Sequence, residues 1–134
     1  MVLSQSRQVI QIEPDPLAPY AISPGWRVGD LLFLSGQAAI DDQGAIVGVN
    51  DFDAQLVQTF INIDQVLKAG GSNRSNIVKV TIYLTDMSDF PKIVEARKKY
   101  LTAPYPADTI IEVNTLALPE LMVEIDVIAV VSPI

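Results

Sequence analysis

Three carboxylates in the C-terminal third of the chain stand among apolar, β-branched residues. Asp108 lies near the start of the segment YPADTIIEV, and Glu124 and Asp126 lie within MVEIDVIAV. A carboxylate in such a setting costs free energy unless it faces water, is paired, or serves a function. Desolvated in a cleft, it can position or deprotonate a water molecule. These acids are therefore candidates for an acid–base site; the alternative is that they line a solvent-facing or inter-subunit side of a sheet.

Strand periodicity relates the three acids to one another. Glu124 and Asp126 are two residues apart, so they share one face of a strand while valine and isoleucine occupy the other. Asp108 is in phase with Ile110 on the preceding strand. If Asp108 and Glu124 approach closely, the pKa of one of them should rise, which would give an acid and a base at neutral pH.

The composition excludes several classes of site. The chain has no cysteine and no histidine, so thiol nucleophiles, zinc thiolate sites and Ser-His-Asp triads are absent. No loop of spaced acids predicts a calcium site, and no cofactor motif is present, so we expect neither a metal nor a cofactor. The net charge is −7, and the densest basic run, ARKKY at 96–100, is typical of a solvated helix face. A nucleic-acid partner is disfavoured.

Hydrophobic periodicity predicts two helices among several strands. Leu56, Phe60, Ile63 and Leu67 form one apolar helical stripe, which Asp51 or Asp53 can cap and Gly70-Gly71 can end. A second helix is expected over 86–101, with Asp89 as cap and Pro91 in the first turn. The predicted strands cover 7–13, two segments of 26–37 about the Gly29-Asp30 turn, 76–84, 107–113 and 122–131.

This order predicts a single α+β domain over 1–134, with a mixed sheet of about six strands and two helices packed on one face. The other face of the sheet would need cover. Hydrophobic residues make up 49% of the chain, which is a large share for this length. We therefore expect another subunit to pack against the uncovered face of the sheet. The sequence shows neither a signal region nor a run long enough to cross a membrane, and we expect a cytoplasmic protein without a membrane partner.

Five segments, in this order and at these distances, resemble the RidA/YjgF family of reactive intermediate imine deaminases, also labelled L-PSP endoribonucleases. They are APY with RVGDLLFLSGQ, NIDQVLKAGG, VKVTIYLTDMSDF, PAD and VEIDVIAV. The similarity runs from about Tyr20 to Val131. It implies a chorismate-mutase-like α+β subunit, assembled as a homotrimer with ligand clefts between neighbouring subunits.

The resemblance also implies roles for individual residues. It makes Glu124 the residue that positions the attacking water, and it places Tyr20, Ser35 and Gly36 in the ligand cleft. The substrates of active members are imines or enamines, such as 2-aminoacrylate, which are hydrolysed to a keto acid and ammonia. In those members an arginine after the Pro-Ala pair binds the substrate carboxylate, and that position is held here by Asp108.

Asp108 at this position changes what the cleft can bind, because an acceptor-only anion replaces a bidentate cation. Three interpretations of Asp108 remain open: it binds an amine-bearing ligand, it works with Glu124 as a carboxylate pair, or it is a surface acid. Val94, where many active members have an asparagine, and Ile110 are expected beside the ligand. Arg27 or Arg97 of a neighbouring subunit could replace the missing cation.

The sequence thus predicts a RidA-like homotrimer that binds and hydrolyses a small nitrogen-containing metabolite, with Glu124 and Asp108 as catalytic candidates. Activity on the usual 2-imino acids should be weak or absent. The alternative is a non-catalytic trimer that binds a small ligand. Endoribonuclease activity is disfavoured, because the chain lacks histidine and carries a net negative charge.

Overall fold

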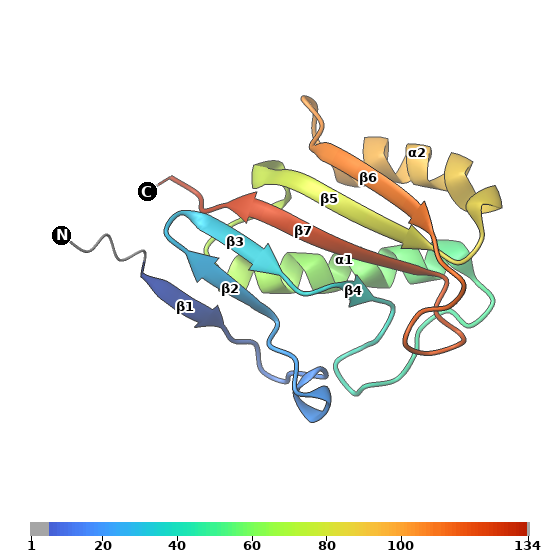
Figure 1. Ribbon diagram of the computed structural model, residues 1–134, viewed down its shortest axis with the longest axis horizontal. Helices are drawn as coiled ribbons and strands as arrows, with labels where there is room; N and C mark the ends of the chain where they lie inside the picture. The colour runs from blue at the N-terminus through green and yellow to red at the C-terminus, as the bar shows by residue number, and fades with distance from the viewer. Residues whose placement is uncertain (1–5, 134) are drawn as a thin grey trace.

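A computed structural model describes residues 6–133 and shows a mixed sheet with both α-helices behind it (Figure 1). The helices are α1 (Phe52–Ala69) and α2 (Phe90–Tyr100), and single 3-10 turns cover Ala18–Tyr20, Arg74–Asn76 and Met87–Asp89. The strands are β1 (Arg7–Ile10), β2 (Gly25–Val28), β3 (Leu31–Leu34), β4 (Gln37–Ala38), β5 (Ile77–Leu84), β6 (Ala107–Glu112) and β7 (Val123–Val130).

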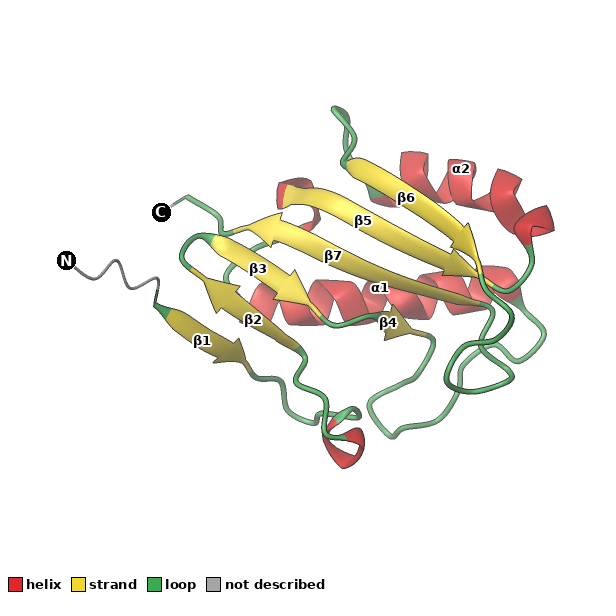
Figure 2. Cartoon of the chain, viewed as in Figure 1, coloured by secondary structure: helices red, strands yellow, loops and turns green. Residues whose placement is uncertain are grey.

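The sheet has the order β1-β2-β3-β7-β5-β6, and the two-residue β4 also pairs with β7. All neighbours are antiparallel except β5 and β6, which run parallel. Parallel strands need a crossover connection, and α2 provides it. The predicted α+β class and the two helices on one face are confirmed, and β4 adds a seventh strand to the six expected (Figure 2).

The helix α1 forms where its local signals predict. Asp51 caps it, because its side chain accepts a hydrogen bond of 3.0 Å from the Ala54 amide. The predicted apolar stripe is buried against the sheet, and Ile63 and Leu67 are fully enclosed. The helix ends at Gly70-Gly71, where Gly71 has a φ of +83° that favours glycine.

The start of α2 differs from the prediction. Asp89 makes no capping hydrogen bond; instead the Asp86 side chain accepts one from the Ser88 amide and begins the short turn before the helix. Pro91 lies in the first turn, as predicted. Ile93 and Ala96 are buried in the core, so this face of α2 fixes the helix beside β5 and β6.

The two faces of the sheet differ in how far their side chains are buried. Valine, isoleucine and leucine side chains of β5 and β7 on the helix side are almost completely buried. Figure 1 shows no element covering the opposite face in the described part of the chain. Large apolar side chains remain exposed on that face. Trp26 and Phe33, which pair across β2 and β3, are 39% and 41% exposed. Such an apolar surface is typical of an interface.

Candidate functional site

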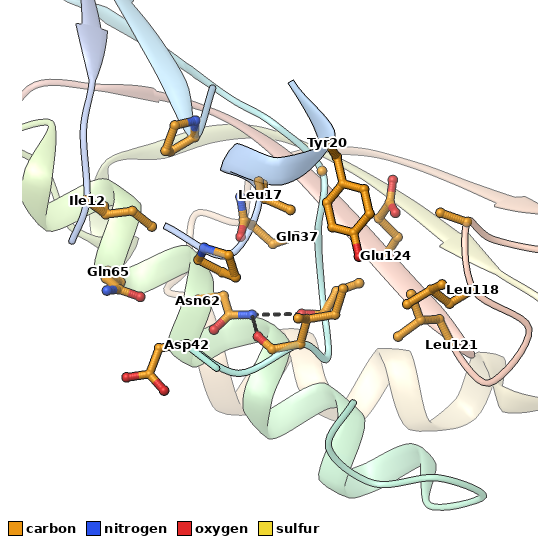
Figure 3. Close-up of a pocket in the computed structure, with 16 residues that line it drawn as sticks. Ile12, Leu17, Tyr20, Gln37, Asp42, Asn62, Gln65, Leu118, Leu121 and Glu124 are labelled. Atoms are coloured by element: carbon orange, nitrogen blue, oxygen red, sulfur yellow. Dashed lines mark hydrogen bonds between the residues drawn. The ribbon is translucent and has the colours of Figure 1, made fainter. Parts of the chain in front are cut away.

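A cavity of about 240 Å³ lies between the 3-10 turn Ala18–Tyr20, the end of β4 and the loop before β7 (Figure 3). Glu124 and Gly36 are neighbours in its wall, and Tyr20 projects alongside Glu124. Most of the lining is apolar, while Asn62, Gln65 and Asp42 add polar groups. We call this cavity the Glu124 pocket. It has the usual character of a small-ligand site, an apolar wall with a few polar groups.

The Glu124 carboxylate is half-buried in this pocket. Burial, with a smaller contribution from the negative charge of Asp126, raises the pKa of Glu124 above its ordinary value. A carboxylate of this kind holds a proton more readily and is a better base when ionised than one in water. Gly36 leaves the space that the carboxylate fills, because a Cβ atom there would overlap the Glu124 side chain.

Two amide side chains of α1 hold the segments that carry the pocket. Gln55 is fully buried; it donates to the carbonyls of Gly48 and Glu120 and accepts from the Met122 amide at 2.8 Å. This fixes the entry to β7 two residues before Glu124. Asn62 donates to the carbonyls of Ala38 and Ile40, at 2.8 and 2.7 Å. The pocket walls are therefore attached to the longest helix by fully paired polar groups.

Asp108 lies in a second, more open depression of about 430 Å³, formed by α2 and β6. Both oxygens of its carboxylate accept hydrogen bonds from Arg97, from Nε and from one terminal nitrogen, each at 2.9 Å. The Asp108 side chain is 20% exposed and the Arg97 side chain 24%, although the backbone of Asp108 lies at the open edge of the sheet. This bidentate geometry is the strongest form of an arginine–carboxylate pair. We call this region the Arg97 depression.

The sheet register places Asp108 and Glu124 on opposite faces. Asp108 pairs with Val80 of β5, which belongs to the buried helix side, whereas Glu124 pairs with Tyr83 on the open side. The two acids therefore do not meet within one chain. The interpretation that they form a carboxylate pair is not supported in the subunit, and the Asp108 carboxylate is already occupied by Arg97.

The other predicted site residues divide between the two regions. Tyr20, which is 62% exposed, and Gly36 line the Glu124 pocket, and Val94 and Ile110 line the Arg97 depression. Ser35 lines neither: its hydroxyl donates to the Ser23 carbonyl at 2.5 Å and closes the loop before β4.

Of the two arginines considered as a replacement cation, Arg97 lies in one of these regions. Arg27 lies elsewhere in the chain. Its Nε donates to the Gly29 carbonyl at 2.9 Å, and it lines a shallow depression beside Gln8 and Gly70. Within one subunit, Arg27 therefore reaches neither Glu124 nor Asp108.

Several lining residues of the Glu124 pocket were not predicted. Asn62 and Gln65 lie three residues apart on α1, and together with Gln58 they form a polar stripe beside the apolar one, a signal that the sequence did contain. Leu118 and Leu121 come from the loop before β7, where no periodicity points to a pocket. Their contribution depends on how the loop folds back, which local sequence does not specify.

Within residues 6–133 no cluster of three acidic side chains is arranged to hold a metal ion. The same part of the chain has no helix that is both long and apolar enough to span a bilayer.

A mixed sheet backed by two helices, with a half-buried carboxylate beside an apolar pocket, defines a small α+β domain with a candidate small-ligand site. The family model described as endoribonuclease L-PSP matches residues 10–131. A RutC family protein of Pyrococcus horikoshii is 35% identical over 116 residues, which cover 87% of this chain and 90% of the relative. A 2-iminobutanoate/2-iminopropanoate deaminase of Dermatophagoides farinae is 31% identical over 121 residues, covering 90% of this chain and 92% of that protein.

Solved structures agree with these matches. RidA from the Antarctic bacterium Psychrobacter sp. PAMC 21119 superposes with a TM-score of 0.84 at 33% identity, covering 92% of this chain and 99% of that one. The chain belongs to the RidA/YjgF family, also described as the endoribonuclease L-PSP family.

Proposed function

We propose that this protein hydrolyses a small imine or enamine to a carbonyl compound and ammonia, in clefts between the subunits of a homotrimer. The observation that carries the proposal is the Glu124 carboxylate, half-buried in an apolar pocket, where burial raises its pKa. Ionised Glu124 accepts a hydrogen bond from a water molecule and removes its proton as the water attacks the imine carbon. The deaminase among the relatives supports this reaction class.

The separation of the two regions supports a cleft shared by two subunits. The Glu124 pocket borders the open face of the sheet, and the Arg97 depression lies beside α2 on the other side. The two regions share no lining residue, so one small ligand does not reach both within a subunit, but the pocket of one copy can face the depression of the next. The apolar open face, with Trp26 and Phe33 exposed, would supply the contact that holds the copies together.

The family label of endoribonuclease finds no support in the site. No described residue of the Glu124 pocket is a lysine or an arginine, so the pocket offers no attraction to phosphate. A different alternative, a trimer that binds a small ligand without chemistry, predicts the same pocket. It differs in one measurable result, since a ligand would stabilise the protein without being consumed.

We expect slow but measurable hydrolysis of 2-aminoacrylate generated in situ, followed by ammonia release. The rate should be on the order of 10²-fold lower than that of a relative with an unpaired arginine in the cleft, because Asp108 neutralises Arg97 here. Ammonia release no faster than in buffer, together with thermal stabilisation by a small ligand, would favour the non-catalytic alternative. A rate equal to that of the relative would show that the pairing has no effect.

Gly36→Ala should displace the catalytic carboxylate while preserving the fold. The added Cβ atom would meet the end of the flexible Glu124 side chain, whose Cδ and Cγ atoms would lie at 2.9 and 3.2 Å, so the side chain moves before the backbone does. A displacement of about 1 Å in a catalytic group can cost 10²-fold in rate. We therefore expect a large fall in kcat with an almost unchanged melting temperature. An unaltered kcat would mean that the present position of Glu124 is not needed for the reaction.

A further inference from the structure

The Arg97–Asp108 pair is held in one orientation. Asp108 engages Nε and one terminal nitrogen of Arg97, and the guanidinium carbon lies 5.6 Å from the centre of the Phe90 ring. The second terminal nitrogen, Nη1, has no hydrogen-bond partner in the described part of the chain and belongs to a side chain that lines the depression. An arginine has five N–H donors, and a bidentate carboxylate uses only two of them. One edge of the guanidinium thus remains available and its direction is fixed.

The free edge of the Arg97 guanidinium is shielded from water by its neighbours. Apart from Lys98, the residues around it are largely apolar: Phe90, Val94, Leu101, Tyr105 and Ile110. Lys98 is paired with Glu95 at 3.7 Å, and 64% of its side chain is exposed. Arg97 is therefore the one well-shielded cation of the depression among the described residues. A hydrogen bond to a charged group is stronger in such shielded surroundings than in water.

We propose that Arg97, oriented by Asp108, is the residue that selects a carboxylate on the ligand. The proposal rests on the proposed function, whose 2-imino acid substrates would carry such a group. The carboxylate would accept hydrogen bonds from the free edge of Arg97, while Asp108 acts as a positioning residue behind it. Because Asp108 also repels an anion, the preference for a carboxylate over a neutral group is moderate. The pairing would allow a cleft with an acid at position 108 to bind an anion.

Binding of two probes tests the proposal without any turnover. The probes are 2-oxobutanoate and its neutral amide, 2-oxobutanamide, which differ in charge and hardly in size, and ligand-observed NMR measures both dissociation constants. The unaltered protein should bind the acid more tightly than the amide. Arg97→Gln should weaken binding of the acid on the order of tenfold or more and leave binding of the amide nearly unchanged. Asp108→Arg should do the opposite and strengthen binding of the acid relative to the amide. It removes the two hydrogen bonds that orient Arg97, but it also replaces the repelling carboxylate by a cation that can itself bind the acid, and the change of charge is the larger effect.

Lys98→Gln is the matched control, since it removes a neighbouring cation on the same helix that is exposed and paired elsewhere. It should leave the ratio of the two dissociation constants unchanged. If the pair had a purely structural role, each substitution would change both dissociation constants by a similar factor. The proposal instead requires the ratio of the two constants to change in opposite directions in Arg97→Gln and Asp108→Arg.

An unaltered protein that binds acid and amide equally, or binds neither, would overturn the proposal, as would a ratio that Arg97→Gln does not change. None of these results bears on hydrolysis itself, which ammonia release from 2-aminoacrylate judges separately.

Discussion

Glu124→Gln should abolish most of the hydrolytic activity while leaving the fold intact. The amide keeps the size of the side chain and its contact with Gly36, but it cannot remove a proton from water. Loss of a general base typically costs 10²- to 10⁴-fold in rate, and we expect kcat to fall by about that factor. Ammonia release from 2-aminoacrylate measures it.

Asp126→Asn is the matched control for this substitution. Asp126 lies two residues further along β7 on the same face and accepts a hydrogen bond from the Tyr83 hydroxyl at 3.0 Å, but it does not line the Glu124 pocket. Asp126→Asn removes only the smaller contribution to the raised pKa of Glu124, so kcat should change far less than in Glu124→Gln. If both substitutions lowered kcat equally, or if Glu124→Gln retained full activity, Glu124 would not be the catalytic base.

Glu124→Gln should also keep or raise the stability of the fold at neutral pH. The pKa of Glu124 is higher in the folded protein than in the unfolded chain, so the folded state binds this proton more tightly. The ionised carboxylate therefore costs stability at a pH above its folded pKa, and that cost disappears as the pH falls through this value. At neutral pH, Glu124→Gln should melt at the same temperature as the parent protein or higher. The difference should shrink in acid, which thermal unfolding at several pH values would show.

The sequence predicted those parts of the fold that depend on neighbouring residues. The helix α1 follows from a continuous apolar stripe, a capping aspartate and a glycine pair, all within one segment. The error at Asp89 has a local cause too: the chain makes a short 3-10 turn first, so the capping role passes to Asp86. The strand β4 is two residues long, too short for an alternating pattern to identify it.

The candidate site was predictable only in part, because it depends on the register of the strands. Alternation shows that Asp108 and Ile110 share a face of β6, but it does not say on which side of the sheet that face lies. The pairing of both β6 and β7 with β5 decides this, and it separates Asp108 from Glu124. The Arg97–Asp108 pair likewise depends on how α2 crosses over to β6, which brings together residues that are 11 positions apart.

Assembly should depend on the apolar open face of the sheet, and Phe33→Glu should disrupt it. Phe33 is 41% exposed on the apolar open face of the sheet, next to Trp26. A carboxylate buried there without a partner would cost several kcal/mol per copy, enough to dissociate a small oligomer. We expect light scattering to show a trimer for the parent protein and a monomer for Phe33→Glu at micromolar concentration. Ile61→Glu is the control, because Ile61 is 52% exposed on α1 and should leave the assembly intact.

Subunit complementation would then show that each cleft uses two copies. Glu124→Gln inactivates the pocket side of a cleft, and Val94→Tyr should block the depression side, since Val94 lines it between α2 and β6. Each variant alone should be nearly inactive. Unfolded and refolded together in equal amounts, they should recover roughly a quarter of the parent activity, because that share of clefts combines an intact pocket with an intact depression. If the mixture stays inactive although mixed trimers form, the site lies within a single subunit, and the assignment of the Arg97 depression to the cleft is wrong.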